Sequence, residues 1–169
     1  GKRSECMIVY HGSTEIIKIP DVSHSKRYLD FGKGFYVTTF ENQAKKWAVR
    51  KGMRQEKTAI VNIYELSEEW KNFKVLSFEK ENEKWLDFVC ACRKGEPINK
   101  EYDIIIGNVA DDNVFKTVDM YFRGLWNKEK VLSELRYYKM NDQICIVNQE
   151  TLNQLITFEM AYEVENNDG

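Results

Sequence analysis

The first residues that could do chemistry are His11, Gly12 and Ser13, at the end of an apolar run over residues 6–13. A histidine titrates near neutral pH and can hold a hydroxyl or move a proton. A glycine beside it lets a ligand approach the backbone, whose N–H and C=O can then bind an amide. A single histidine more often has a structural or solvated role, as we expect for His24 in its polar loop, so His11 needs other groups that converge on it.

A second unusual stretch is LDFGKGFYVTT at residues 29–39, where Gly32 and Gly34 precede an aromatic strand. Glycine loses more conformational entropy on folding than any other residue, so two of them at the mouth of a strand need a reason. The pattern indicates that the backbone here passes close to another group. If that group is a ligand, Tyr36 would offer it a flat ring for stacking.

Polar residues in the second half of the chain could complete such a site. Asp142 and Gln143 precede an apolar run near the end, and Glu150 follows it. Asp111 and Asp112 form a further pair at the start of an expected helix. Carboxylates at that place commonly cap the helix and complement its dipole. The alternative is that they border a cleft and meet a substrate.

The elements that would position these residues follow from hydrophobic periodicity. Ala44, Trp47 and Ala48 have helical spacing, so we expect Trp47 to face the core from a helix that ends near Gly52. Strands are expected at residues 6–13, 34–39, 58–66, 73–78, 102–107, 142–148 and 157–164, and helices at 41–52, 82–94, 110–124, 127–139 and 149–156. Helices and strands do not alternate strictly, which predicts an α+β fold rather than a doubly wound sheet.

Composition limits the class of protein. The chain has 169 residues, which fits a single domain over 1–169 with the ends 1–5 and 165–169 frayed. The net charge of -2 gives no general attraction to nucleic acid or to an anionic membrane, although it leaves room for a local patch. No apolar run reaches the roughly 20 residues of a membrane span, and we expect no signal peptide, because the first residues lack its pattern. The four cysteines lack the partners of a zinc site, so we expect reduced thiols in a cytoplasmic protein without a metal.

Three segments together resemble the ADP-ribosyltransferase superfamily: VYHGS at 9–13, DFGKGFYVTT at 30–39 with the helix ENQAKKWA behind it, and NDQICIV at 141–147. The chain looks most like an uncharacterised bacterial family of such domains, a domain of unknown function. The resemblance covers residues 7–163. It implies two sheets that splay apart around a cleft for NAD⁺, with flanking helices. The chain has no G-x-G-x-x-G after a strand, so the expected NAD⁺ site rests on this resemblance.

The resemblance is to the histidine–tyrosine–glutamate version of the superfamily. It implies that His11 holds the adenosine ribose, while the backbone of Gly12 pairs with the nicotinamide amide. Tyr36 would lie against the nicotinamide ring, so we expect the strands at 7–10 and 34–39 to put His11 and Tyr36 on one cleft wall. Further cofactor contacts are implied for Ser13, Gly32, Gly34, Phe35 and Thr38.

The third catalytic position departs from that pattern, because the family's glutamate falls on Gln143. A glutamate would bind the nicotinamide ribose and place negative charge beside an oxocarbenium-like transition state. Glutamine can accept the same hydrogen bond, but charge-assisted hydrogen bonds are about twice as strong as neutral ones. Asp142 and Glu150 are the nearby carboxylates that could replace the missing charge. Because Gln143→Glu would add that charge, we expect this change to keep or raise activity.

Two functions of different classes follow from these expectations. One is an NAD-dependent mono-ADP-ribosyltransferase, with NAD⁺ as a substrate and a protein, nucleic acid or small molecule as acceptor. The other is a catalytically weak NAD- or nucleotide-binding or protein-interaction module that retains the fold. Bacterial domains of this kind often act as toxins paired with an antidote, so the resemblance also implies an antitoxin protein as a partner.

Overall fold

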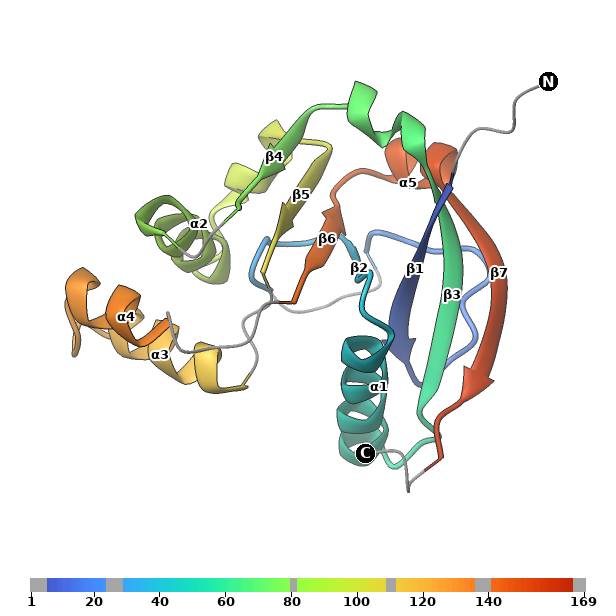
Figure 1. Cartoon of the computed structure of the whole chain (residues 1–169), viewed down its shortest axis with the longest axis horizontal. Helices are drawn as coiled ribbons and strands as arrows, with labels where there is room; N and C mark the ends of the chain where they lie inside the picture. The colour runs from blue at the N-terminus through green and yellow to red at the C-terminus, as the bar shows by residue number, and fades with distance from the viewer. Residues whose placement is uncertain (1–5, 24–28, 80–81, 109–111, 136–140, 166–169) are drawn as a thin grey trace.

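The computed structural model describes residues 6–23, 29–79, 82–108, 112–135 and 141–165. Two β-sheets with helices around them make up the fold (Figure 1). The strands are β1 (Cys6–Ser13), β2 (Phe35–Val37), β3 (Ile60–Ser67), β4 (Val75–Ser77), β5 (Ile104–Gly107), β6 (Gln143–Ile146) and β7 (Ile156–Glu163). The α-helices are α1 (Glu41–Gln55), α2 (Glu83–Arg93), α3 (Asp112–Phe122), α4 (Lys128–Leu135) and α5 (Gln149–Leu155), and 3-10 helices cover η1 (Glu68–Asn72) and η2 (Pro97–Glu101). The predicted α+β class is confirmed.

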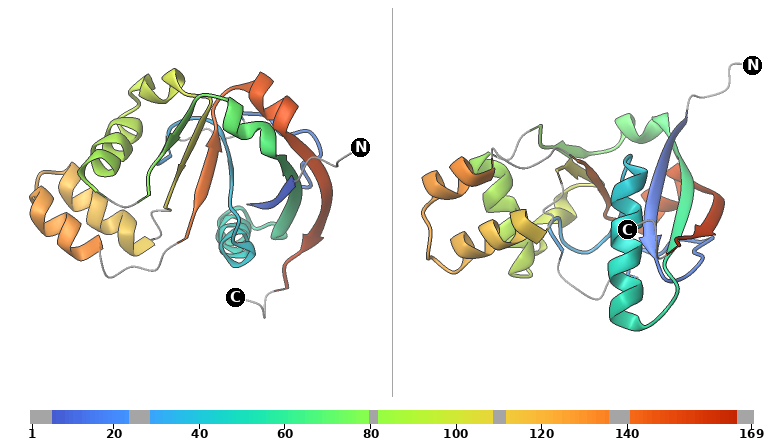
Figure 2. Two further views of the ribbon diagram at one scale, coloured as in Figure 1. Left: turned by 45° about the horizontal axis from the view of Figure 1, so that its top comes forward. Right: turned by 60° about the horizontal axis from the view of Figure 1, so that its bottom comes forward.

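The two sheets meet where β1 and β2 lie side by side. The first sheet has the strand order β1-β3-β7 and is antiparallel. The second has the order β2-β6-β5-β4, in which β4 and β5 run parallel and the other pairs antiparallel. Tyr10 of β1 and Thr38, just beyond β2, exchange two backbone hydrogen bonds that join the sheets. The helices α2, α3 and α4 lie on the side of the second sheet that faces away from the first sheet (Figure 2).

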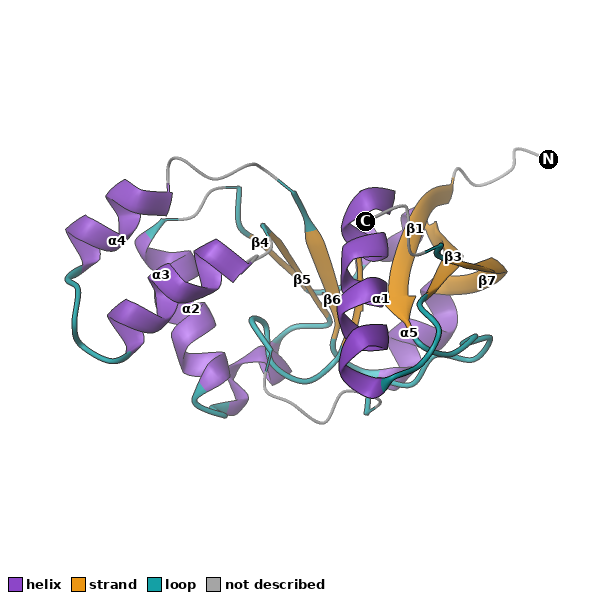
Figure 3. Ribbon diagram, turned by 90° about the horizontal axis from the view of Figure 1, so that it is seen from below, coloured by secondary structure: helices purple, strands orange, loops and turns teal. Residues whose placement is uncertain are grey.

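The second sheet separates two hydrophobic cores, because successive side chains of a strand point to opposite faces. Phe35 and Ile146 face the first sheet and pack in one cluster with Tyr64. Tyr36 and Cys145 point the other way, into a cluster with residues of α2, α3 and α4. Figure 3 shows these helices on that side of the second sheet. Since both faces are covered, all four residues of β6 are buried.

α1 packs on the first sheet through its smallest side chains. Ala44 and Ala48 are fully buried, and Gly52 continues the same stripe. The predicted helix end at Gly52 is wrong, since the helix runs on until Glu56 caps it in the left-handed conformation. Gly52 instead makes room for the returning chain, because a Cβ there would lie 2.7 Å from the carbonyl oxygen of Lys57.

Other expectations from the sequence concern the chain as a whole. No disulfide joins the four cysteines. Within the described ranges, no helix is both long and apolar enough to cross a membrane. The expected frayed ends at 1–5 and 165–169 lie outside the described residues except for Glu165, and His24 lies outside them as well.

Candidate functional site

The end of β1 presents backbone groups on the edge that β3 does not occupy. β1 pairs with β3 so that Gly12 lies opposite Val61. On its other edge, Tyr10 exchanges hydrogen bonds of 2.8 and 2.9 Å with Thr38. Backbone groups alternate in direction along an antiparallel strand, so the N–H and C=O of Gly12 point the same way as those of Tyr10. They lie two residues beyond the bridge to Thr38, where the amide of a ligand could pair with both.

Gly12 is also the point at which α1 crosses β1. A Cβ at this position would lie 2.1 Å from the oxygen of Ala44 and 2.7 Å from the nitrogen of Ala48. Helix packing therefore requires glycine here, whatever the strand edge binds. The same crossing brings the Cβ of Trp47 within 3.0 Å of that position, so the Trp47 side chain begins beside Gly12.

His11 is held in one orientation at the junction of the two sheets. Its Nδ1 lies 2.6 Å from the carbonyl oxygen of Tyr36. A carbonyl can only accept, so Nδ1 carries the proton and Nε2 is the acceptor nitrogen of the neutral ring. The imidazole also stacks on the ring of Phe35, with centroids 4.4 Å apart and planes at 25°. The ring is thus fixed before any ligand binds.

Tyr36 contacts His11 through its backbone, but its ring points elsewhere. The ring lies in the core beneath α2, α3 and α4, on the other face of β2 from Phe35. Its hydroxyl donates to the oxygen of Gly32 at 2.5 Å and accepts from the nitrogen of Phe31 at 3.0 Å. Burial raises the pKa of Tyr36 well above its usual value, and Cys145 adds to the effect. The sequence led us to expect the rings of His11 and Tyr36 on one cleft wall. That expectation is wrong, because His11 stacks on Phe35, on the opposite face of β2 from the Tyr36 ring.

The two glycines before β2 have neighbours within the protein. Gly32 has a φ of 80°, and a Cβ there would lie 2.6 Å from Nδ2 of Asn99. A Cβ on Gly34 would lie 2.5 Å from the sulfur of Cys145. The backbone that the sequence pattern predicted to pass close to another group thus passes close to η2 and β6, and a ligand contact at these glycines stays a prediction.

Gln143 belongs to a buried polar cluster at the start of β6. Its Nε2 donates to Asp30 Oδ2 at 3.0 Å and to the oxygen of Asn108 at 3.3 Å. Asp30 is in turn paired with Arg93, whose Nε lies 3.0 Å from Oδ1 and whose Nη2 also donates to that oxygen. Because both acceptors engage the NH₂ group, the amide oxygen of Gln143 points away from them. That oxygen is the part of the side chain that could accept a hydrogen bond from a ligand.

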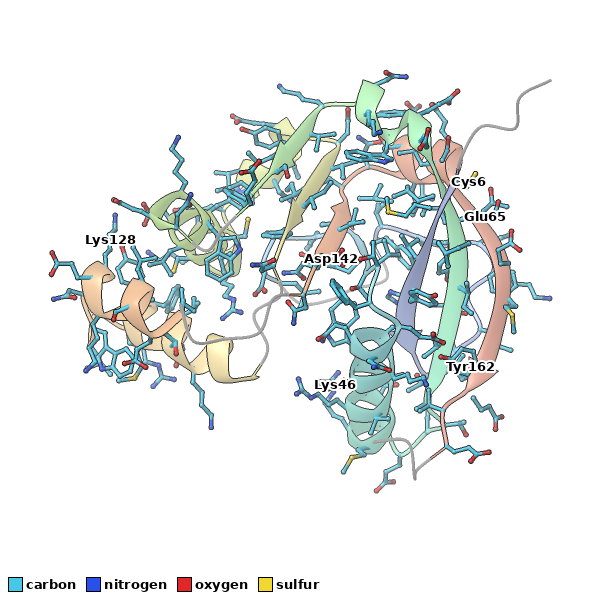
Figure 4. The ribbon with its side chains drawn as sticks, in the orientation of Figure 1. Cys6, Lys46, Glu65, Lys128, Asp142 and Tyr162 are labelled. Carbon is cyan, nitrogen blue, oxygen red and sulfur yellow. The ribbon has the colours of Figure 1, made fainter. Side chains whose placement is uncertain are left out.

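Asp142 fixes the chain between β2 and α1. Its Oδ1 accepts from the hydroxyl of Thr38 and the nitrogen of Thr39, each at 2.8 Å, and its Oδ2 accepts from the Thr39 hydroxyl. Figure 4 shows this carboxylate at the end of β6 nearest α1. Glu150 is exposed on α5, beyond the opposite end of β6, and so does not join Gln143. Of the two carboxylates considered from the sequence, only Asp142 lies next to Gln143.

The remaining predicted positions differ in what the structure says of them. Ser13 and Thr38 are fully buried, and the Ser13 hydroxyl has no hydrogen-bond partner among the described residues. Asp111 lies outside the described residues. Asp112 opens α3, and its cleft or capping role stays a prediction.

Trp47 is the residue whose place near the site the sequence reading missed. Helical spacing predicted it in the core, but it is half-buried and lies outside the packed stripe of Ala44 and Ala48. The local pattern gave no signal of this, because Trp47 shares its helical spacing with Ala44 and is followed by Ala48 and Val49. Only the packing of α1 shows that Ala44, Ala48 and Gly52 form its buried side.

Comparison with known proteins places the chain in a family without assigning it an activity. No curated protein matches it. One family model matches residues 7–158, nearly the whole chain. By that match, the chain belongs to the family described as "Protein of unknown function (DUF3990)".

Proposed function

We propose that the chain is a mono-ADP-ribosyltransferase that binds NAD⁺ beside the edge of β1 and transfers ADP-ribose to a macromolecular acceptor. The two sheets would then be those of an ADP-ribosyltransferase-like fold. The observation that carries the proposal is the direction of the Gly12 backbone, whose N–H and C=O leave β1 on the edge away from β3. The nicotinamide carboxamide has one acceptor oxygen and one NH₂ donor, so it can pair with both groups as a neighbouring strand would.

His11 supports a contact with a ribose of the same ligand. Its protonated Nδ1 is engaged by the Tyr36 carbonyl, so the neutral ring accepts through Nε2. A ribose hydroxyl is a suitable donor to that nitrogen. The stacked ring of Phe35 holds the imidazole in place, which lowers the entropy lost when the ligand binds.

Gln143 would act at the reacting ribose through its amide oxygen. In transfer, the bond between the ribose carbon and the nicotinamide nitrogen breaks, and its electrons leave with nicotinamide. The acceptor atom then bonds to that carbon and loses a proton. A neutral amide stabilises the intervening oxocarbenium less than a carboxylate does, so we expect slow, single transfer.

A second candidate is an NAD⁺-binding module without useful turnover. The observation that favours it is the bonding of Gln143, whose NH₂ group joins β6 to Asp30 and Asn108. Such a link stabilises the fold whether or not a reaction occurs. Nicotinamide release separates the two candidates, because both bind NAD⁺ and only the first cleaves it.

The carboxamide contact is tested with two dinucleotides that differ in one group. Nicotinic acid adenine dinucleotide carries a carboxylate in place of the carboxamide and so cannot donate to the C=O of Gly12. We expect it to bind about 5- to 150-fold more weakly than NAD⁺, since an unpaired buried group costs about 1–3 kcal/mol. Equal affinities measured by calorimetry would mean that the carboxamide does not pair with the backbone of Gly12. If neither compound binds, both candidate functions are contradicted.

A cellular experiment tests the toxin expectation. If transfer arrests growth, expression of the chain should stop cell division, and His11→Ala should relieve the arrest at equal protein level. An antitoxin partner would relieve it without a mutation. Unimpaired growth with the parent chain would contradict the toxin role and leave the dinucleotide test to decide the binding site.

A further inference from the structure

α1 has one side that packs and two flanks that face different parts of the protein. Ala44, Ala48 and Gly52 form the packed side. One flank lies toward β7, where the hydroxyl of Tyr162 donates to Glu41 at 2.6 Å. The other flank carries Gln43, whose Oε1 accepts from Asn141 just before β6. This second flank therefore faces the candidate site.

Three cations lie on the site-facing flank. Lys46, Arg50 and Arg54 follow one another at intervals of four residues and are exposed. Figure 4 shows Lys46 leaving α1 on the side of α3, with Tyr162 on the opposite side. A helix rises about 1.5 Å per residue, so neighbouring cations start about 6 Å apart and the row spans about 12 Å.

An aromatic ring lies beside this row of cations. Glu41 is the one acidic residue of α1, and it lies on the other flank. Trp47 lies between Lys46 and Arg50 in the sequence, and it is half-buried next to Gly12. Evenly spaced cations next to an aromatic ring match a chain of phosphates with bases attached, because cations pair with phosphates and rings stack on bases.

We propose that this flank of α1, formed by Lys46, Trp47, Arg50 and Arg54, binds single-stranded nucleic acid. A duplex keeps its bases stacked and away from Trp47, whereas a single strand can offer them. A pyrophosphate is shorter than the row and would engage only part of it. The net charge of the whole chain is -2, so binding depends on this local row and not on a general attraction. The bound strand would also be the acceptor, a step that rests on the proposed function.

The experiment measures binding of a short fluorescein-labelled single-stranded oligonucleotide of mixed sequence by fluorescence anisotropy over a range of salt. The test variant is Lys46→Gln/Arg50→Gln/Arg54→Gln. Its matched control is Lys18→Gln/Lys84→Gln/Lys100→Gln, which removes the same charge from exposed lysines outside α1. Circular dichroism establishes that each variant is folded.

Three lost phosphate contacts should make the plot of log K against log salt shallower by about 2 in the test variant, and weaken binding about 100-fold near 0.1 M salt. The control should bind within a few-fold of the parent. Trp47→Ala should weaken binding roughly 5- to 150-fold, as the loss of one stacked base does, while Trp47→Phe retains most of it.

Other results would overturn the proposal. Equal losses in the test variant and its control would mean a general charge effect. If a duplex of the same sequence binds with equal affinity, then no base stacks on Trp47 in the complex. If the test variant loses affinity for NAD⁺ but the parent binds no oligonucleotide, the row holds the pyrophosphate of the dinucleotide. None of these readouts needs ADP-ribose transfer, so a failed transfer assay leaves the result intact.

Discussion

The amide of Gln143 donates to the carboxylate of Asp30 at 3.0 Å, inside a cluster that is largely closed to solvent. Arg93 pairs with the same carboxylate, so the three side chains together carry no net charge. This arrangement has room for a donor at position 143, but not for a second anion. The sequence alone suggested that Gln143→Glu would keep or raise activity, and the cluster changes that expectation.

Gln143→Glu should destabilise the fold at neutral pH. The new carboxylate would face both Asp30 and the carbonyl of Asn108 without a proton to donate, at a cost of about 1–3 kcal/mol. The pKa of this carboxyl in the folded state would be raised above the unfolded value of about 4.3. The free energy of unfolding should therefore fall as pH rises from about 4.3 to the folded-state pKa, and it should recover as pH falls. Urea unfolding at several pH values measures the effect.

The matched control for this change is the double variant Gln143→Glu/Asp30→Asn. An amide at position 30 can donate to the new carboxylate, so most of the lost stability should return at neutral pH. A Gln143→Glu protein as stable as the parent at pH 7 would mean that the two side chains separate easily, and the bonding role of Gln143 would be contradicted.

Tyr36→Phe should lower stability at neutral pH and flatten its dependence on alkaline pH. The change leaves the oxygen of Gly32 and the nitrogen of Phe31 without a partner, at about 1–3 kcal/mol. The folded-state pKa of Tyr36 is raised by burial, so the parent loses stability as pH rises above about 10, where the unfolded chain ionises. The pKa of Tyr64 is also raised by burial, so Tyr64→Phe should likewise flatten the alkaline loss. Identical alkaline slopes for all three proteins would contradict this.

Gly12→Ala should disturb the packing of α1 on β1. The added methyl group would meet the oxygen of Ala44 at 2.1 Å, and overpacking of this kind costs about 1–3 kcal/mol or more. Gly124→Ala is the control, because its Cβ meets no atom within 4 Å and only its φ of 77° opposes the change. Thermal melts should show the larger loss at position 12, and equal losses would mean that α1 can shift without cost.

Trp47→Ala should cost less stability than a core tryptophan does. Its ring is half-buried, so we expect about 1–2 kcal/mol rather than the 3–5 kcal/mol of a fully buried ring. Affinity for NAD⁺ should fall as well, because the ring begins beside Gly12. A loss of about 3–5 kcal/mol with unchanged NAD⁺ affinity would instead give Trp47 the core role that its helical spacing predicted.

Much of the fold could be predicted because each element has a clear local pattern. The run before Ser13 is short and apolar, which is typical of a strand, and Ala44 and Ala48 have the spacing of a packed helix face. Helix ends were harder to predict. Glycine often ends a helix, but Gly52 lies within α1, where it lets the following chain pass close to the helix. Glycine permits both roles, and only the path of the chain decides between them.

The site was harder to predict, because its geometry depends on contacts between distant segments. Nothing in the local pattern shows that the backbone of Tyr36 bonds His11 while its ring turns into the core beneath α2. The partnership of Gln143 and Asp30 joins residues far apart in the sequence, so periodicity carries no sign of it. Gln143 and Cys145 share a face of β6, as alternation along a strand requires, but no local pattern shows which helices cover that face.

Release of nicotinamide from NAD⁺ tests the proposed site most directly, measured for the parent, His11→Ala and Gln143→Ala after each is shown to be folded. The parent should release nicotinamide slowly. Gln143→Ala should be roughly 5- to 150-fold slower, which corresponds to a barrier higher by about 1–3 kcal/mol. His11→Ala should bind NAD⁺ more weakly as well as react more slowly. If the parent binds NAD⁺ and releases no nicotinamide, the chain is a binding module; if all three proteins release nicotinamide at the same rate, the edge of β1 is not the site.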